Sequence, residues 1–270
     1  MSLSLESTCT GVIGVGNMGE ALLAGLIQAG VPASNICFSE KRDERAAEIS
    51  AKYGATRKSN LEIALDCTVI LLVTKPQDLE PLISEIATSI KSETLLVSFA
   101  AGKTTSFIEE RLTGSPCVIR VMPNTPALIG KGMAAISAGK FATKDQLDFV
   151  HTFLTACGEV VEVPENLQDA VTALSGSGPA YFFAMVEAMV AAGTQLGLSA
   201  EVATKLANQT IYGAAGMLLE SGKSATTLRE NVTSPNGTTA AALKVFADSE
   251  LNGIVLKAMT AARDRSQELA

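Results

Sequence analysis

The sequence predicts a doubly wound α/β domain followed by an all-helical domain. The first part of the chain alternates short apolar, β-branched runs with amphipathic stretches, the pattern of a parallel sheet covered by helices. Beyond residues 162–165 the strand pattern stops, and Ala, Leu, Met and Glu dominate. We therefore assign residues 1–163 to a dinucleotide-binding (Rossmann-type) domain and residues 164–270 to a helical domain for dimerisation and substrate binding.

Six strands are expected in the first domain and six helices in the second. Short apolar runs, several of them near-continuous, predict strands covered on both faces, over residues 11–15, 35–39, 68–73, 94–99, 117–121 and 133–137. The segments between the early strands are long enough for helices, which favours right-handed βαβ units. Helices are then expected over residues 165–174, 180–196, 199–220, 224–231, 238–248 and 250–269.

The hydrophobic content is high for a soluble monomer, at 47% of 270 residues with 4% aromatic residues. The best candidate for a membrane span, Gly178–Leu198, carries Glu187 at its centre, where a charge is costly in lipid. The first ten residues have neither the basic nor the apolar region of a signal peptide. We expect a cytoplasmic protein without membrane association, whose surplus apolar surface lies in a subunit interface.

Charge and cysteine usage exclude further classes of function. A net charge of −7 disfavours nucleic-acid binding, because affinity for nucleic acid depends largely on neutralising phosphates. The five cysteines show no CxxC spacing, and His151 is the only histidine. This pattern argues against a disulfide framework and against a zinc site, so no bound metal is expected. His151 lies in an amphipathic run and is interpreted as a surface or packing residue rather than a catalyst.

A glycine-rich loop follows the first strand directly and precedes an apolar helix. Residues 14–19, GVGNMG, match the G-x-G-x-x-G pattern. In this context Gly14 permits the tight turn, Gly16 lets a pyrophosphate approach the backbone, and Gly19 lets the helix pack on the sheet. The amides at the helix N-terminus favour an anion. The loop therefore predicts a dinucleotide site.

The turn after the second strand, residues 39–42, lies where the adenosine ribose is expected, roughly 20 residues beyond the loop, and is called the ribose turn below. Its residues give conflicting signals. Glu40 suits a ribose 2′-hydroxyl and hence NAD, whereas Ser39, Lys41 and Arg42 suit a 2′-phosphate and hence NADP. A charged turn that only caps a surface helix is the alternative for each residue. The balance favours NADP(H).

Later strand ends are expected to line the same crevice. Thr74-Lys75-Pro76 follows the third predicted strand, and Ala100 follows the fourth. Asn124 stands between two prolines after the fifth strand, where its restricted backbone suits it to hold a nicotinamide amide. The alternatives are a rigid turn at Asn124 and a solvated loop lysine at Lys75.

The helical domain offers one polar turn, residues 233–240 with the sequence TSPNGTTA, that opens onto a helix. The amides of Gly237, Thr238 and Thr239 would form a nest suited to a carboxylate. An ordinary helix N-cap is the alternative. Residues 175–195 contain no lysine that would serve a β-hydroxyacid dehydrogenase as a proton source. A cyclic iminium, which arrives already protonated, needs no strong general acid.

With these motifs the chain resembles the pyrroline-5-carboxylate reductases over nearly its whole length. The motifs are GVIGVGNMGEALLAGL (11–26), VTKP (73–76), SFAAG (98–102), RVMPNTPA (120–127), LSGSGPAYFF (174–183) and LRENVTSPNGTTAAAL (228–243). The last is the most specific, because it lies outside the generic dinucleotide-binding pattern. The resemblance implies reduction of the C=N bond of 1-pyrroline-5-carboxylate to L-proline with NADPH or NADH, the final step of proline biosynthesis.

The resemblance also implies roles for individual residues. Ala100, Asn124 and Pro126 would lie near the nicotinamide, and Asn231, otherwise a helix-end residue, would reach the cofactor. Together with the ribose turn and the residues that line the nucleotide site, the expected cofactor-binding set is Gly14, Val15, Gly16, Asn17, Met18, Gly19, Ser39, Lys41, Arg42, Asn60, Val73, Thr74, Lys75, Pro76, Ala100, Asn124, Pro126 and Asn231.

On the substrate side, the resemblance implies that Gly237, Thr238 and Thr239 bind the carboxylate, with the Thr239 hydroxyl near the ring nitrogen as the catalytic group. Many relatives carry Gly where this chain has Asn236, and Asn also tolerates a left-handed backbone. Helical domains of this family interlock into homodimers that assemble further into decamers. Two alternatives remain open: a related reductase of another cyclic imine or a β-hydroxyacid, and a non-catalytic nucleotide-binding protein.

Overall fold

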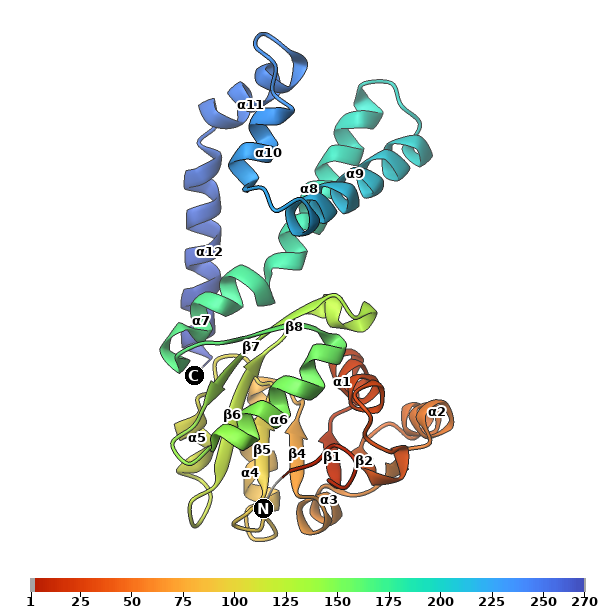
Figure 1. Cartoon of the computed structure of the whole chain (residues 1–270), viewed down its shortest axis with the longest axis vertical. Helices are drawn as coiled ribbons and strands as arrows, with labels where there is room; N and C mark the ends of the chain where they lie inside the picture. The colour runs from red at the N-terminus through yellow and green to blue at the C-terminus, as the bar shows by residue number, and fades with distance from the viewer. Residues whose placement is uncertain (1–2, 270) are drawn as a thin grey trace. The chain divides into compact units, whose positions relative to one another are not determined.

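The computed structural model describes residues 3–269 and contains two compact units (Figure 1). The first unit comprises the chain up to Ser177 together with its end from Ala262, and the second is Gly178–Ala261. The first is an α/β unit and the second is helical, so the predicted fold class is confirmed. The units divide after Ser177, while the sequence pattern changes earlier, near residue 163.

An eight-stranded sheet in the order β3-β2-β1-β4-β5-β6-β7-β8 forms the centre of the first unit. Neighbouring strands pair in parallel except β6 and β7, which are antiparallel. The strands are Thr10–Ile13 (β1), Ile36–Ser39 (β2), Thr56–Arg57 (β3), Val69–Leu72 (β4), Leu95–Ser98 (β5), Cys117–Met122 (β6), Gly132–Ala138 (β7) and Gly158–Glu162 (β8).

All six predicted strands are present, and two further strands, β3 and β8, extend the sheet at its edges. β3 is two residues long, too short to produce a sequence pattern. β8 has the sequence GEVVE, with two valines between two glutamates, and its residues are half-buried or exposed. Because an edge strand is covered less completely than a central one, it lacks the apolar run by which the other strands were predicted.

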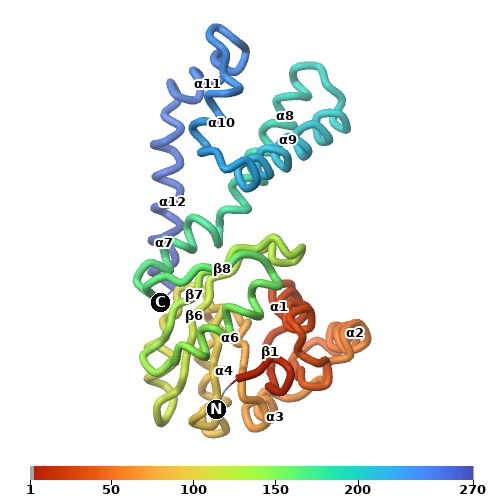
Figure 2. Tube along the Cα trace, viewed as in Figure 1, coloured from red at the N-terminus to blue at the C-terminus, as the bar shows by residue number. Residues whose placement is uncertain are grey.

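Helices cover both faces of this sheet (Figure 2). One face packs against α1 (Asn17–Gln28), α2 (Asp43–Tyr53) and α6 (Lys144–Leu154). The other face packs against α3 (Asn60–Asp66), α4 (Pro76–Ile86) and α5 (Thr105–Glu109). Short helical turns complete this part of the chain: Ala33–Asn35 (η1), Thr125–Ile129 (η2) and Thr155–Cys157 (η3).

This arrangement gathers the loop and helix starts at one edge of the sheet. β1, β2 and β4 are parallel neighbours, so their carboxyl ends meet at that edge. α1 follows β1, α2 follows β2, and α4 follows β4 after short loops. The carboxyl edge of such a sheet is where ligands of doubly wound proteins bind.

A buried arginine anchors the end of the chain to the first unit. The Arg120 side chain on β6 is 4% exposed, and its guanidinium lies 3.7 Å from a Glu165 oxygen and 3.4 Å from an Asp169 oxygen. Asp169 also accepts a hydrogen bond of 2.7 Å from the Ser266 hydroxyl. The charge of Arg120 is therefore compensated by segments distant in sequence, which fixes the last turn of the final helix on the α/β unit.

The helices of the second half follow the predicted order. Residues 165–176 form three short turns rather than one helix: Glu165–Leu167 (η4), Gln168–Val171 (α7) and the π-helical turn Thr172–Gly176 (η5). The remaining helices are Gly178–Gln195 (α8), Ala200–Glu220 (α9), Ala225–Asn231 (α10), Thr238–Asp248 (α11) and Leu251–Glu268 (α12). Within the described residues, no helix is both long enough and apolar enough to cross a bilayer.

The helical unit has almost no core of its own. Of its described residues, only Gly178, Ala203 and Ala207 are buried. Large apolar side chains point to solvent instead, including Phe183 on α8, 63% exposed, and Leu219 on α9, 84% exposed. Exposed apolar surface of this extent marks an interaction surface. The surplus hydrophobicity of the sequence is therefore located largely in this unit.

Candidate functional site

The glycine loop has the geometry that its sequence predicts. Gly14 has a φ of +95°, a conformation that L side chains rarely adopt, and its N–H donates to the Ser39 carbonyl at 3.0 Å. A Cβ on Gly19 would lie 2.0 Å from the Gly14 carbonyl oxygen, so only glycine allows α1 to start so close to β1. By contrast, a Cβ on Gly16 would meet nothing within 4 Å. The space beside Gly16 is therefore open to a ligand.

The N-terminus of α1 is free to bind an anion. Gly16 is the N-cap, and no side chain caps the helix. The first N–H groups of a helix have no partner within the helix, and its dipole adds a partial positive charge there. A pyrophosphate can accept hydrogen bonds from these N–H groups, and its negative charge is favoured by the dipole. The loop therefore fits the phosphate part of a dinucleotide.

A cavity of about 400 Å³ lies at this edge of the sheet and is lined by residues of the first unit. The structure brings seven predicted cofactor residues together around it: Gly14, Ser39, Lys41, Asn60, Val73, Thr74 and Lys75. The Thr74 hydroxyl is buried and has no hydrogen-bond partner among the described residues. A buried hydroxyl without a partner is costly, which indicates that a ligand or water satisfies it.

One wall of this cavity was not predicted. Asp78, Pro81, Leu82 and Glu85 line it from α4. They recur three or four positions apart, which places them on one helix face. The sequence signal was present, because Pro76 starts a helix and this spacing follows it. Pro81 and Leu82 supply apolar surface, while Glu85 accepts a 2.9 Å hydrogen bond from the Asn60 side chain.

The ribose turn is held by its own charges. Glu40 accepts hydrogen bonds from the Arg42 backbone N–H at 3.0 Å and from Arg42 Nε at 3.1 Å. Burial acts to raise the pKa of the Glu40 carboxyl, but these Arg42 contacts outweigh it and the pKa is lowered. Glu40 is therefore an ionised group already paired with Arg42. Ser39 Oγ donates to Asn60 Oδ1 at 2.6 Å, which holds Asn60 against β2.

A charge network that the sequence did not reveal braces the loop. Glu20, in the first turn of α1, accepts hydrogen bonds from Arg45, Lys52 and Tyr53 of α2. Arg45 Nε also donates to the Val15 carbonyl at 3.2 Å. α1 and α2 are thus tied together immediately behind the glycine loop and the ribose turn. No short-range pattern predicts these pairs, because the partners are far apart in sequence.

The Glu20 network predicts an acid-sensitive stability. Its hydrogen bond from Lys52, followed by those from Arg45 and Tyr53, lowers the pKa of Glu20 to about 2. Because this lies below the unfolded value of about 4.3, the stabilisation is complete above about pH 5 and is lost as the pH falls through about 2. We expect Glu20→Gln to lower the free energy of unfolding at pH 7 by about 1 to 2 kcal/mol, since partly exposed Lys52 is screened by solvent. Urea unfolding of the parent protein and the variant at pH 7 and pH 3 measures this difference in unfolding free energy. A difference of the same size at both pH values would contradict the role assigned to Glu20.

Asn124 uses both ends of its side-chain amide within the first unit. Its Nδ2 lies 3.2 Å from the Ser175 carbonyl oxygen and 3.3 Å from Ser175 Oγ, and its Oδ1 accepts from the Met133 N–H at 2.8 Å. These contacts favour the rigid-turn interpretation. A contact of Asn124 with a nicotinamide stays a prediction, as does that of Pro126. Ala100 is buried, and its N–H lies 3.4 Å from Ser98 Oγ.

The polar turn of the helical unit opens α11 as predicted. Asn236 adopts the left-handed backbone, with a φ of +58°, and Gly237 is the N-cap of α11 without a side-chain cap. One detail differs from the expectation: the Gly237 N–H donates to the Ser234 carbonyl at 3.0 Å and closes the turn. The free donors are therefore the amides of Thr238, Thr239 and Ala240 in the first turn of α11.

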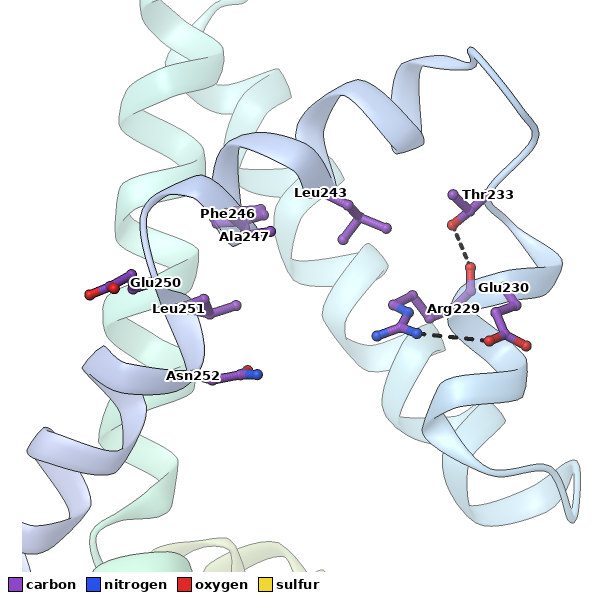
Figure 3. Close-up of a pocket in the computed structure, with 9 residues that line it drawn as sticks. All are labelled: Arg229, Glu230, Thr233, Leu243, Phe246, Ala247, Glu250, Leu251 and Asn252. Atoms are coloured by element: carbon purple, nitrogen blue, oxygen red, sulfur yellow. Dashed lines mark hydrogen bonds and ion pairs between the residues drawn. The ribbon is translucent and has the colours of Figure 1, made fainter.

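A second cavity, of about 570 Å³, lies in the helical unit (Figure 3). Its lining includes Arg229 in the last turn of α10, Thr233 in the turn that follows α10, and apolar Leu243, Phe246 and Leu251. Thr238 and Thr239 do not line it, so it is distinct from the predicted carboxylate nest. Asn231 is exposed at the end of α10, and His151 is exposed on α6, in agreement with a surface role for the histidine.

Two family models each match one part of the chain. A family model described as NADP oxidoreductase, coenzyme F420-dependent, matches residues 10–102, and one described as pyrroline-5-carboxylate reductase dimerisation matches residues 165–269. The pyrroline-5-carboxylate reductase of Corynebacterium melassecola is 41% identical over 266 residues, covering 97% of this chain and 98% of that protein. The chain belongs to the pyrroline-5-carboxylate reductase family.

Solved structures of the family share the whole fold. The pyrroline-5-carboxylate reductase of Coxiella burnetii has a TM-score of 0.90 at 36% identity, covering 98% of this chain and 99% of that one. The Plasmodium falciparum pyrroline carboxylate reductase, solved with NADP bound, has a TM-score of 0.88 at 29% identity, with coverages of 98% and 99%. The family relationship thus extends over both units.

Proposed function

We propose that the protein reduces 1-pyrroline-5-carboxylate to L-proline with hydride from NAD(P)H, the final step of proline biosynthesis. Family membership over nearly the full length is the observation that carries the proposal. The glycine loop and the polar turn at α11 support it, because both have the geometry that their proposed ligands require.

In this proposal the first unit binds the cofactor. The amides at the start of α1 hold the pyrophosphate beside Gly16, and the cavity at the carboxyl edge takes the adenosine part, with Thr74 and Lys75 among its polar contacts. Pro81 and Leu82 offer apolar surface to the base. The bound nicotinamide supplies the hydride.

The ribose turn favours NADPH over NADH. Lys41 lines the cavity and Arg42 offsets the charge of Glu40, so the turn can accept a 2′-phosphate. We expect the double variant Lys41→Ala/Arg42→Ala to lower kcat/KM about 10- to 100-fold with NADPH, because charge-assisted hydrogen bonds are lost. With NADH the change should stay within about threefold. Initial rates with each cofactor give the two kcat/KM values. An equal fall in kcat/KM with NADPH and with NADH would contradict a 2′-phosphate contact at this turn.

The second unit binds the substrate carboxylate. The free amides of Thr238, Thr239 and Ala240 point from the start of α11, where the helix dipole favours a negative charge. The Thr239 hydroxyl lies on the same turn and would contact the ring nitrogen. A protonated imine is already electrophilic, so these residues need to position the substrate rather than protonate it. This fits the absence of a lysine along α8.

We further propose that the chain works as a cytoplasmic homodimer, built through the helical unit and able to assemble further into a decamer. The exposed apolar side chains of α8 and α9 need a partner, and a second copy of the same unit carries matching faces. Five free cysteines fit a reducing compartment.

The dimer proposal predicts the effect of one charge on α8. Phe183→Glu replaces a large apolar side chain, 63% exposed in the single chain, by a charged carboxylate. We expect this variant to sediment as a monomer, since an unpaired charge in an interface is costly. Leu65→Glu, on an exposed apolar position of α3 in the first unit, is the matched control and should sediment like the parent protein. If both variants sedimented with the same oligomeric mass, the assigned interface would be wrong.

The reaction is tested by following NADPH and NADH oxidation with 1-pyrroline-5-carboxylate, a six-membered cyclic imine and a β-ketoacid, the oxidised partner of a β-hydroxyacid. We expect turnover with the first and at least about tenfold lower kcat/KM with the others, since specificity follows the fit of the substrate to the site. Faster turnover of another substrate would assign the protein to a related reductase. Tight NADPH binding without any turnover would support a non-catalytic nucleotide-binding protein instead.

A further inference from the structure

Three cysteines meet at the amino ends of the central strands, whereas the glycine loop lies at their carboxyl ends. Cys9 immediately precedes β1, Cys37 is the second residue of β2, and Cys67 ends α3 just before β4. Their sulfur atoms all lie within 4.8 Å of one another. No pattern in the sequence indicates this cluster, because the three residues are far apart along the chain and are brought together only by the pairing of parallel strands.

The cluster is held in place by the surrounding backbone. The Cys9 carbonyl accepts hydrogen bonds from the Thr68 N–H at 3.0 Å and the Val69 N–H at 3.2 Å, which fixes Cys9 beside Cys67. A Cβ on Gly11 would lie 2.2 Å from Ile63 Cγ2 and 3.2 Å from the Cys67 sulfur. The absence of a side chain at Gly11 therefore provides the room in which Cys67 sits.

The sulfur separations suit a shared metal ion. Thiolates bind Zn²⁺ at about 2.3 Å, so three sulfurs around one ion are separated by about 4 Å. In the structure Cys9 Sγ and Cys67 Sγ are 3.3 Å apart, and no pair exceeds 4.8 Å. Small side-chain rotations reach the required spacing. Cys37 and Cys67 are buried, whereas Cys9 is partly exposed and offers a route from solvent.

Neighbouring charge also favours a cation bound by thiolates. Lys58 lies close enough to interact electrostatically with Cys9 and Cys37, and its positive charge favours thiolates there. Asp66 is already paired with Lys58 at 2.7 Å. Within residues 3–269, no histidine, aspartate or glutamate joins the three sulfurs.

We propose that Cys9, Cys37 and Cys67 form a three-thiolate site for one thiophilic d¹⁰ cation, Zn²⁺ or Cu⁺. Binding releases three thiol protons to solvent as three metal–sulfur bonds form, and no electron is transferred. The ion would fasten the amino ends of β1 and β2 to the junction of α3 and β4. Because the dinucleotide motif lies at the other edge of the sheet, the site is structural and independent of the proposed reductase activity.

Titration of the reduced full-length protein with Cd²⁺, a spectroscopic probe for thiolate sites, tests the proposal. We expect a sulfur-to-cadmium charge-transfer band that saturates at one equivalent per chain, accompanied by a rise in Tm. The apparent dissociation constant should increase at least about 100-fold in Cys9→Ser, since each lost thiolate removes a metal–ligand bond. Cys117→Ser and Cys157→Ser change cysteines outside the cluster and should titrate like the parent protein.

Cys9→Ser is the decisive variant, because Cys9 is only partly buried and its replacement should leave the fold intact, as NADPH binding and the unliganded Tm will report. A Cys37→Ser variant that stays folded should weaken cadmium binding to the same degree. The proposal would be overturned by the absence of a saturating band, by unchanged affinity in a folded Cys9→Ser, or by equal weakening in the two control variants.

Discussion

Gly16→Val is expected to raise the dissociation constant for NADPH at least about 100-fold, through the loss of charge-assisted contacts to phosphate. The backbone at Gly16, with φ −66° and ψ −163°, is accessible to any residue, and a Cβ there meets no protein atom within 4 Å. The valine methyls would instead occupy the space that a pyrophosphate needs. The cost to folding should be about 1 kcal/mol, since valine is a poorer N-cap than glycine. Fluorescence titration with NADPH and thermal unfolding measure the two effects.

Gly19→Ala is the matched comparison. Its main expected effect is a loss of stability, whereas the main expected effect of Gly16→Val is a loss of NADPH affinity. Its Cβ would lie 2.0 Å from the Gly14 carbonyl oxygen, so α1 must move away from β1. We expect a loss of about 3 kcal/mol or more in unfolding free energy, in line with overpacking against rigid backbone. If Gly16→Val bound NADPH normally, or if both variants lost stability equally, the assignment of the loop to the cofactor would be wrong.

Thr239→Ala is expected to lower kcat/KM for 1-pyrroline-5-carboxylate by about 10²-fold, the usual cost of removing one well-placed donor from a reacting site. Thr239 occupies the first turn of α11, where neither Gly237 nor another side chain caps the free amides. Removing its hydroxyl leaves those amides in place, so carboxylate binding should be retained in part. Steady-state rates with saturating NADPH give the value.

The dissociation constant for NADPH separates a role at the substrate from one at the cofactor. It should stay within about twofold of the parent value in Thr239→Ala, because the proposed nucleotide contacts, apart from Asn231, lie in the first unit and none of them is made by Thr239. Thr239→Ser keeps the hydroxyl and should recover most of the activity. Loss of NADPH binding in parallel with turnover, or no recovery with serine, would remove Thr239 from its proposed role.

The features that the sequence predicted are those that depend on local pattern. The apolar run before Gly14 and the helix that begins at Asn17 define a strand, turn and helix whose geometry is nearly fixed by residue type. The left-handed backbone of Asn236 follows in the same way from its side chain. β8 was missed because an edge strand needs no apolar run, and its identity depends on pairing with β7.

The features that the sequence did not predict depend on pairs of residues distant along the chain. Glu20 meets Lys52 only because α1 and α2 cover the same face of the sheet. The bond between the Gly237 N–H and the Ser234 carbonyl, which removes one expected donor, depends on how the turn closes. The cysteine cluster likewise exists only once β1, β2 and β4 are paired.

The central claim is that this chain transfers hydride from a nicotinamide to the imine carbon of 1-pyrroline-5-carboxylate. The most direct test is a single turnover with NADPH deuterated at C4 on the transferred face, followed by mass and NMR analysis of the product. We predict L-proline that carries one deuterium, located at C5, the former imine carbon. Proline without deuterium, deuterium at another carbon, or the absence of proline would contradict the claim.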